Sequence, residues 1–320
     1  MDYLDLHNSS IVVDAHSDIP LHILKNKMEG NKDEEIFNAY HMPLLKEGGV
    51  NIVVVNLFEN LHPEGSLKEA LIEVSELKKQ LDNNDEAILI YNKEDLHKAL
   101  KENKIGVVLS MEGMEPISNE IVLLRTFYEL GLRSAILTWN WRNYFASGSW
   151  ETGGLSKLGK ELIVEMENLG IIIDVSHLNE EGFWDIMKIA KTPVIASHSN
   201  AKALYNHVRN LSDDQIKAIA DTGGVIGVNT YFTGDKEKGE VSIDTYMNHM
   251  EYLLDVAGED HVGLGFDFNG YLGSPKLKGL EDCSKATIVT NELIKRGYSE
   301  TTIKKVLGEN FLGVLENILK

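Results

Sequence analysis

The sequence alternates short apolar runs with longer amphipathic segments along almost its whole length. The apolar runs predict eight strands, most of them near-continuous in valine, isoleucine and leucine: residues 11–15, 50–57, 105–110, 134–138, 171–176, 193–197, 225–229 and 262–266. Such continuous runs are typical of parallel strands that are covered on both faces. The alternation therefore predicts an α/β fold built on a parallel sheet.

The amphipathic segments have apolar residues at helical spacing and predict eight helices: residues 67–82, 119–130, 155–169, 180–190, 212–221, 243–257, 281–296 and 299–319. Asn119, Ser212 and Ser299 are placed to cap three of these helices, and several of the segments end at a glycine. No linker rich in proline, glycine or serine interrupts the pattern. We predict one (β/α)8 TIM barrel over residues 1–320, with extra helices at the C-terminal end. A doubly wound open sheet is the alternative.

Charge and composition narrow the classes of partner. The chain has 320 residues and a formal net charge of −19, from 50 acidic and 31 basic residues. Because this charge repels phosphate backbones and anionic lipid headgroups, we expect no nucleic-acid or membrane partner. The single cysteine, Cys283, excludes an intrachain disulfide. With no signal-peptide pattern at the start and no apolar run of about 18 residues, we expect a soluble cytoplasmic protein.

Residues able to bind a metal follow several of the predicted strands. In a (β/α)8 barrel the reactive groups lie where each strand runs into its following loop. Six residues occupy such positions after five strands: His16, Asp18, Glu112, His177, His198 and Asp267. Each of them alone could be a surface or turn residue, but the shared placement predicts a metal site, since imidazole and carboxylate are ligands that zinc accepts. Asp174, inside an apolar run, is expected to be an internal hydrogen-bonding partner instead.

The number of these residues suits two metal ions. Glu112 can bridge two ions about 3.5–4 Å apart, one oxygen to each. A water molecule between the ions would lose a proton near neutral pH and become the nucleophile. Asp267 is placed to take that proton and pass it to a leaving group. The two ions would then be completed by separate pairs of ligands, His16 with Asp18 and His177 with His198.

With these residues identified, the chain resembles the membrane (renal) dipeptidase family, zinc dipeptidases of the amidohydrolase barrel type. The resemblance extends from about Ile11 to the C-terminal helix. It rests on seven motifs in the same order: residues 14–20 (DAHSDIP), 111–113 (MEG), 174–177 (DVSH), 197–199 (SHS), 209–214 (RNLSDD), 265–270 (GFDFNG) and 279–285 (GLEDCSK). Seven ordered motifs are specific, where any one alone would not be.

The resemblance implies the same division of ligands between two zinc ions and makes Asp267 the acid and base. It also implies that Arg209 binds the carboxylate of the substrate, for which a guanidinium group offers two parallel hydrogen bonds. Cobalt or manganese are alternatives to zinc, because the same ligands accept them. Members of the family are often dimers, so the resemblance allows a homodimer.

The chain departs from the family pattern after the fourth predicted strand. Animal members carry a histidine there that is thought to steady the oxyanion, whereas this sequence has Trp139. We expect Asn140 or Asn143 to donate a hydrogen bond in its place, or the second zinc ion and backbone N–H groups to carry that charge. Trp139 belongs to an aromatic group that is expected either to line the substrate pocket or to pack beneath it, with Trp141, Tyr144, Phe145 and Trp150.

The sequence thus predicts a metallodipeptidase that cleaves the peptide bond of dipeptides through a hydroxide bridging two zinc ions. Dipeptides with a D-residue at the C-terminal position are included as a variant substrate. One alternative is a related binuclear amidohydrolase that acts on N-acyl amino acids or lactones. The other is a barrel that binds a ligand without catalysis, which the presence of all six chemical residues disfavours.

Overall fold

The computed structural model describes residues 2–31, 35–58, 63–235, 237 and 241–320. Parallel strands form its centre: β1 (Val13–Ser17), β2 (Ile52–Phe58), β4 (Ile105–Glu112), β5 (Leu132–Ile136), β6 (Ile172–Asp174), β7 (Val194–Ile195), β8 (Ile226–Val228) and β9 (Val262–Leu264). Neighbours in the sheet follow the order β7-β6-β5-β4-β2-β1-β9-β8. A parallel bridge between Ala196 and Ile226 joins the two outer strands. The sheet is therefore a nearly closed barrel, which confirms the predicted fold and excludes the open sheet.

All eight predicted strands are present, although several are shorter than predicted. A further strand, β3 (Ala87–Leu89), was not predicted; it pairs in parallel with Ile105–Val107 at the start of β4. Further along β4, the residues from Leu109 onward pair with β5 instead. This additional strand has only three residues and lies outside the ring of eight.

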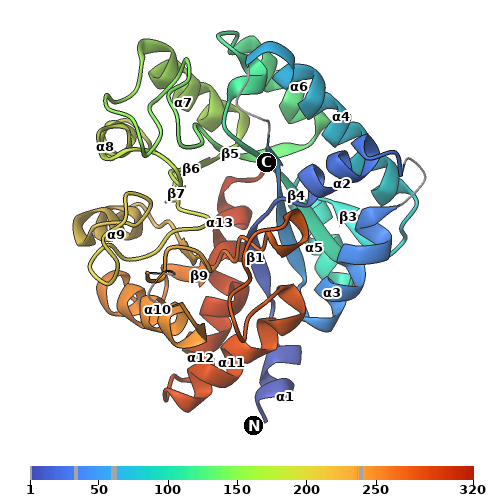
Figure 1. Cartoon of the computed structure of the whole chain (residues 1–320), viewed down its shortest axis with the longest axis vertical. Coiled ribbons are helices and arrows are strands. Elements are labelled where there is room, and N and C mark those ends of the chain that lie inside the picture. Colours follow the sequence, from blue (N-terminus) through green and yellow to red (C-terminus); the bar gives the residue numbers. More distant parts are fainter. Residues whose placement is uncertain (1, 32–34, 59–62, 236, 238–240) are drawn as a thin grey trace.

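Helices surround the barrel in Figure 1. Three of them, α1 (Tyr3–Asn8), α2 (Ile19–Met28) and α5 (Lys93–Lys101), and the short α3 (Met42–Glu47) were not predicted. The others correspond to predicted segments: α4 (Pro63–Asp82), α6 (Val122–Leu130), α7 (Lys157–Leu169), α8 (Glu180–Met187), α9 (Asp213–Asp221), α10 (Ile243–Ala257), α11 (Ala286–Lys295), α12 (Glu300–Lys304) and α13 (Asn310–Ile318).

The predicted helix caps were right at two of three positions. The hydroxyl groups of Ser212 and Ser299 accept hydrogen bonds from the third residue of α9 and of α12. The prediction for Asn119 was wrong, because α6 begins at Val122 and Ile121 precedes it. In the described part of the chain, we find no helix that is both long enough and apolar enough to cross a membrane.

The last predicted helix, 299–319, is confirmed, because the backbone is helical from Glu300 to Ile318 and includes a wide π-type turn at Lys305–Glu309. Gly308 lies in this turn against the carbonyl oxygen of Ile11, so close that a Cβ atom on Gly308 would overlap that oxygen. The turn is followed by α13, whose apolar residues pack against the inner face of the barrel. Gly308 therefore allows the helix to lie directly against the chain that enters β1.

The barrel strands are buried on both faces. Val53 and Val107 face the surrounding helices, whereas their neighbours Ile52 and Val108 face the interior of the barrel. The interior set includes Phe311 and other apolar residues of α13. Alternation between two apolar environments accounts for the continuous apolar runs in the sequence. Because both faces of the strands are apolar, the polar residues of the site lie at the carboxyl ends of the strands.

Candidate metal centre

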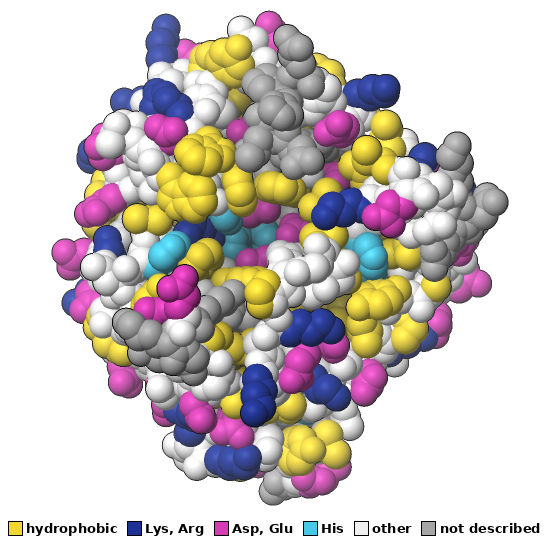
Figure 2. Space-filling model, viewed as in Figure 1, with side chains coloured by type: hydrophobic (Ala, Val, Ile, Leu, Met, Phe, Trp, Pro, Cys, Tyr) yellow, Lys and Arg dark blue, Asp and Glu magenta, His cyan; other side chains and the backbone are white. Residues whose placement is uncertain are grey.

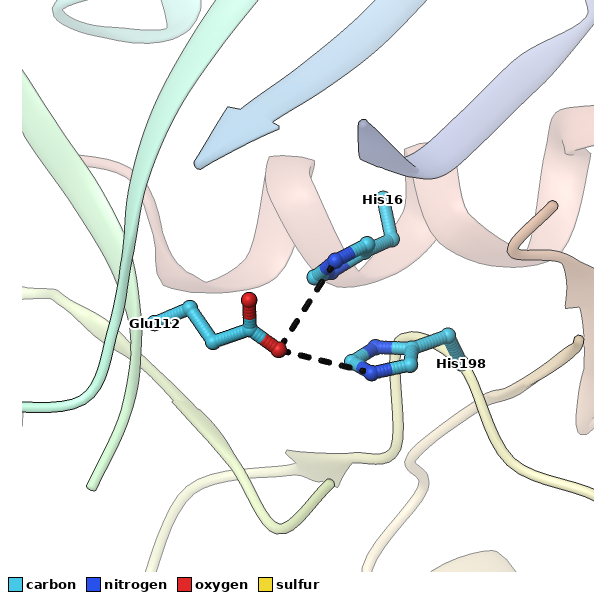
Figure 3. Close-up of side chains that lie close together, drawn as sticks. All are labelled: His16, Glu112 and His198. Atoms are coloured by element: carbon cyan, nitrogen blue, oxygen red, sulfur yellow. Dashed lines mark ion pairs between the residues drawn. The ribbon is translucent and has the colours of Figure 1, made fainter. Parts of the chain in front are cut away.

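Three of the predicted residues point toward one another at the carboxyl end of the barrel. His16 lies in β1, Glu112 is the last residue of β4, and His198 follows β7. Figure 3 shows their side chains converging from these different elements. Glu112 Oε1 lies 3.9 Å from His16 Nε2 and 3.6 Å from His198 Nε2. Residues far apart in the sequence therefore share one centre.

His177 adds a third imidazole around the same carboxylate oxygen. Its Nε2 atom lies 2.8 Å from Glu112 Oε1 and 2.9 Å from His198 Nε2. The backbone of His177 has a positive φ of 67°, which is uncommon for a residue with a side chain. Such strained backbone is frequent at functional sites, where the surrounding structure holds it in place.

Asp18 and Asp267 also lie near the Nε2 atom of His16. One carboxylate oxygen of each is 3.7 Å from His16 Nε2. Asp18 Oδ1 is buried and has no hydrogen-bond partner in the described structure. A buried carboxylate oxygen without a partner is costly unless a cation binds it. All six residues that the sequence singled out thus come together at one centre.

A polar group on the outer nitrogen of each histidine orients its ring. The Nδ1 atom of His16 contacts the side-chain amide of Asn56 at 3.0 Å. His177 Nδ1 lies 2.9 Å from Asn140 Oδ1, and His198 Nδ1 lies 2.9 Å from Ser197 Oγ. These contacts direct all three Nε2 atoms to the centre. At His177 and His198 the partner is an oxygen that can accept a hydrogen bond from Nδ1–H, as is usual for histidines that bind a metal.

The role of Asn56 was missed in the sequence analysis. It is fully buried within β2, among apolar residues. A single amide inside an apolar strand is the signal that was available, because a buried polar group needs a hydrogen-bond partner. The sequence alone does not say that this partner is His16.

Two further buried carboxylates hold the strand ends in position. Asp174 Oδ1 accepts hydrogen bonds from the backbone N–H groups of Ser176 and Ser197 at 2.9 and 3.1 Å. This confirms that Asp174 is an internal hydrogen-bonding partner. Asp14 Oδ1 in the same way accepts from the N–H group of Phe266 at 3.1 Å, and burial raises the pKa of this carboxyl group to about 7.

The electrostatics of the centre favour a bound cation. Burial, with the nearby charges of Asp18 and Asp267, raises the pKa of Glu112 well above its usual range. Burial also lowers the pKa of His16 to about 3 and that of His198 well below the usual value, so these imidazoles are neutral at pH 7. Neutral imidazoles and closely spaced carboxylates are suitable ligands for a divalent metal ion, whose charge would offset the repulsion between the carboxylates.

A cavity of about 270 Å³ opens above this centre. Figure 2 shows a hollow in this face where histidine and acidic side chains gather. Asp18, Glu112, His177 and Asp267 reach the cavity, and its other walls are largely aromatic and aliphatic. The volume suits a small ligand, because it is at the lower end of the range for small-molecule sites.

The aromatic group predicted near the pocket has three kinds of member. Trp139 lines the cavity, whereas Phe145 is fully buried and is not among the described cavity residues. The remaining three are exposed large aromatics at the surface: Trp141, Tyr144 and Trp150. The expectation that the group lines the pocket is therefore met by Trp139 alone.

Asn140 and Asn143 differ in their placement. Asn140 lines the cavity, and its Oδ1 atom is bound to His177 and to the hydroxyl of Ser149, so its Nδ2 group is the part left to donate. Asn143 lies outside the described cavity lining. Its amide donates to the carbonyl oxygen of Leu137 at 2.7 Å and accepts from the N–H of Phe145 at 2.9 Å. The expectation for Asn143 is therefore corrected, since it shapes the loop.

Arg209 lies in the loop between β7 and α9 and is buried. It donates from Nη2 to the carbonyl oxygen of His198 at 3.3 Å, whereas its Nε atom is buried without an acceptor in the described structure. Burial lowers the pKa of Arg209 to about 10, so the side chain stays charged at neutral pH. A charged donor with an unused N–H group is suited to bind an anionic ligand.

The chain matches the family model of membrane dipeptidases (peptidase family M19) over residues 2–320. An uncharacterized dipeptidase of Schizosaccharomyces pombe is 32% identical, over 95% of this chain and 79% of that protein. A crystal structure of the M19 metallopeptidase dipeptidase AC is 27% identical, with a TM-score of 0.88, covering 97% of this chain and 99% of that chain.

A crystal structure of a metallopeptidase from Rhodobacter sphaeroides, liganded with a phosphinate mimic of the dipeptide L-Ala-D-Ala, is also similar. It is 26% identical and has a TM-score of 0.89, and the match covers 97% of this chain and all of that one. The family match spans nearly the whole sequence, and the described site contains the residues on which the resemblance rested. The chain therefore belongs to the membrane dipeptidase family of metallopeptidases.

Proposed function

We propose that this metallopeptidase hydrolyses dipeptides at a centre that holds two zinc ions. The observation that carries the proposal is the position of Glu112 Oε1, which lies within 4 Å of the Nε2 atoms of three histidines. Glu112 would be shared by the two ions, with cobalt or manganese as alternative metals. Each ion would be completed by one pair of residues, His16 with Asp18 and His177 with His198.

When bound, the ions would supply an acidified water molecule and polarise the carbonyl group of the peptide bond. The protein's own part is to move protons and position the substrate. Asp267 accepts the proton of the attacking water and transfers it to the nitrogen of the breaking C–N bond, so that the amine can leave. The amides of Asn269 and Asn229 hold the two oxygens of Asp267, at 2.8 and 3.4 Å.

Two further residues act on the substrate in this proposal. Asn140 lines the cavity, and its Nδ2 group would donate to the oxygen that becomes negative during attack. Arg209 binds the C-terminal carboxylate through its unused Nε and a second guanidinium N–H. Binding of this carboxylate restricts the substrate to two residues, because a third residue would place the carboxylate beyond the reach of Arg209.

The ligand in the Rhodobacter sphaeroides structure mimics a dipeptide with a D-residue at its C-terminal position. Similarity to that protein supports the inclusion of such dipeptides among the substrates of this chain. This part of the proposal concerns only the configuration of the C-terminal residue. Arg209 would bind the carboxylate of an L- or a D-residue at that position.

A substrate panel combined with metal analysis tests the proposal. The panel holds L,L- and L,D-dipeptides, tripeptides, N-acyl amino acids and lactones, and each is assayed with purified protein of measured metal content. We expect close to two zinc ions per chain, hydrolysis of dipeptides and no hydrolysis of tripeptides. Preference for N-acyl amino acids or lactones would replace the dipeptidase proposal, and a metal-loaded protein inactive on the whole panel would favour a barrel that only binds ligands.

A further inference from the structure

The cavity lies between two groups of strand ends on opposite sides of the barrel. Around the ring, β8 is four strands away from β4 in either direction, so their carboxyl ends face each other across the mouth. Phe58 ends β2, and Trp139 follows β5, so these two residues flank Glu112 at the end of β4. Tyr231 and Phe232 follow β8 on the opposite side, and both also line the cavity.

The β8 side carries the groups that would bind the C-terminal half of a dipeptide. Arg209 follows β7, and Asp267 follows β9, so both neighbour the end of β8. Arg209 would bind the carboxylate, and Asp267 would deliver a proton to the departing amine. With the C-terminal residue on this side, the N-terminal residue of the substrate extends toward the end of β4. This step rests on the proposed dipeptidase function.

The wall on the β4 side is aromatic. The rings of Phe58 and Trp139 meet edge to face, with centroids 5.4 Å apart. Trp139 also stacks on His177, at a centroid distance of 6.1 Å and an interplanar angle of 29°, and its third ring contact is Trp150. Three ring contacts hold Trp139 in one orientation, which gives a rigid apolar surface beside the metal centre.

No charged side chain among the described cavity residues lies on the β4 side apart from Glu112, which belongs to the metal centre. A charged substrate side chain placed against Phe58 and Trp139 would therefore lose its water without gaining a partner. An apolar side chain would instead gain the transfer of its surface out of water. The chemistry of this wall discriminates by polarity.

We propose that Trp139 and Phe58 form the pocket for the side chain of the N-terminal residue of the dipeptide. This pocket selects leucine, phenylalanine and similar apolar side chains over glycine and over charged side chains. Trp139 is then a specificity-determining residue. The position that departs from the family pattern in this sequence sets the substrate preference of this enzyme.

Two dipeptide series test the assignment. In the first, the C-terminal residue is alanine and the N-terminal residue is leucine, phenylalanine, glycine or glutamate; in the second, the N-terminal residue is alanine and the C-terminal residue varies. We expect the wild-type enzyme to favour leucyl-alanine over glycyl-alanine and glutamyl-alanine in kcat/KM by roughly tenfold or more, the discrimination usual for a hydrophobic pocket.

The variant Trp139→Ala should reduce this N-terminal preference by roughly tenfold, mainly through a higher KM for leucyl-alanine. Trp139→Phe should keep most of the preference, because an aromatic surface remains. Trp184→Ala is the matched control, since Trp184 lies on α8 against Phe183 and is not among the cavity residues. This control should leave the order of substrates unchanged. Zinc content and thermal midpoint are measured for every variant.

Two results would overturn the assignment. Equal losses for all N-terminal residues in Trp139→Ala would show that Trp139 acts on the metal centre or on the fold. A change confined to the second series would place the pocket at the C-terminal residue instead. If the proposed dipeptidase function itself were wrong, the wild-type enzyme would hydrolyse neither series, which distinguishes that outcome from the two above. Hydrolysis of dipeptides without any N-terminal preference would reject the pocket and leave the dipeptidase function standing.

Discussion

At the scale of single residues, the proposed chemistry depends on a proton carrier, Asp267, that lies beside the metal-type ligands, 3.7 Å from His16 Nε2. Asp267 has a positive φ of 59°, and an amide from each of two loops binds its carboxylate. Burial, and then the charge of Asp18, raises the pKa of Asp267 well above its usual range. A carboxyl group with a raised pKa can both accept and donate a proton near neutral pH.

The variant Asp267→Asn keeps the size of the side chain and removes its ability to carry a proton. We expect kcat to fall by roughly 10²–10⁴-fold while the metal content stays close to that of the wild-type enzyme. Steady-state kinetics on a dipeptide, with elemental analysis of the same samples, measure both quantities. Turnover at the wild-type rate with normal metal content would refute the proton-transfer role.

The variant Arg209→Met removes the charge that would bind the substrate carboxylate. We expect kcat/KM for a dipeptide to fall by roughly 100-fold or more, the scale for removing one partner of a buried charge pair. Arg209→Lys should restore little of the loss, because an ammonium group cannot form two parallel hydrogen bonds. The corresponding dipeptide amide, which lacks the carboxylate, is the control substrate and should respond much less. Equal losses for acid and amide would mean that Arg209 serves the metal centre.

The six residues at the strand ends could be predicted because their chemistry and their position after apolar runs are both visible in the sequence. The residues that orient them could not. The sequence does not show that Asn56 contacts His16, because the two residues lie on different strands. It also does not distinguish Asn143 from Asn140, because only the folded loop shows that the amide of Asn143 donates to Leu137. Such roles depend on contacts between distant segments, which a local pattern does not encode.

At the scale of elements, the strands were easier to predict than the helices. Burial on both faces imposes a continuous apolar run on each strand, whatever the neighbouring segment is. The short helix α5 has only two buried residues, so its amphipathic signal is brief. The wide turn at Lys305–Glu309 includes Gly308, which contacts Ile11 almost three hundred residues earlier in the chain. That contact has no counterpart in the local sequence.

One element is attached to the site loops through a buried histidine. His249 of α10 accepts a hydrogen bond at Nδ1 from the N–H of Ala201, at 3.1 Å. Its Nε2 atom donates to the carbonyl oxygen of Thr233, at 3.3 Å. These two partners require the neutral imidazole with its proton on Nε2. Burial lowers the pKa of His249 to about 4.

Acid should therefore loosen this attachment. Between pH 6.5 and about 4 the unfolded chain binds a proton at His249 that the folded chain does not, so the free energy of unfolding falls as the pH falls through this window. Above pH 6.5 the contribution is fully present. We expect His249→Gln to remove about 1–3 kcal/mol of this pH dependence, measured as urea unfolding at pH 7 and pH 4.5. His97→Gln is the control, because His97 is exposed. Identical pH dependence in wild type and His249→Gln would contradict the prediction.

At the scale of the whole molecule, the metal centre lies where the barrel strands converge. Its residues come from β1, from β4 and from the segments after β6, β7 and β9, so bound cations would link elements that are far apart in the sequence. The protein also has a net charge of −19, and three carboxylates at the centre, buried Glu112 and Asp18 and half-buried Asp267, add local repulsion. Cations bound only by the folded state would reduce that repulsion and stabilise the fold by mass action.

Removal of the metal should therefore lower the stability of the entire barrel. At a free metal concentration 100 times the dissociation constant, binding contributes about 2.7 kcal/mol. We expect dialysis against a chelator to lower the thermal midpoint by several degrees and zinc to restore it, with loss and recovery of activity in parallel. The variant His198→Ala lacks one imidazole of the centre and should show a smaller shift between the chelated and zinc-loaded forms. Equal thermal midpoints for the two forms of the wild-type protein would mean that metal binding is not coupled to folding in this barrel.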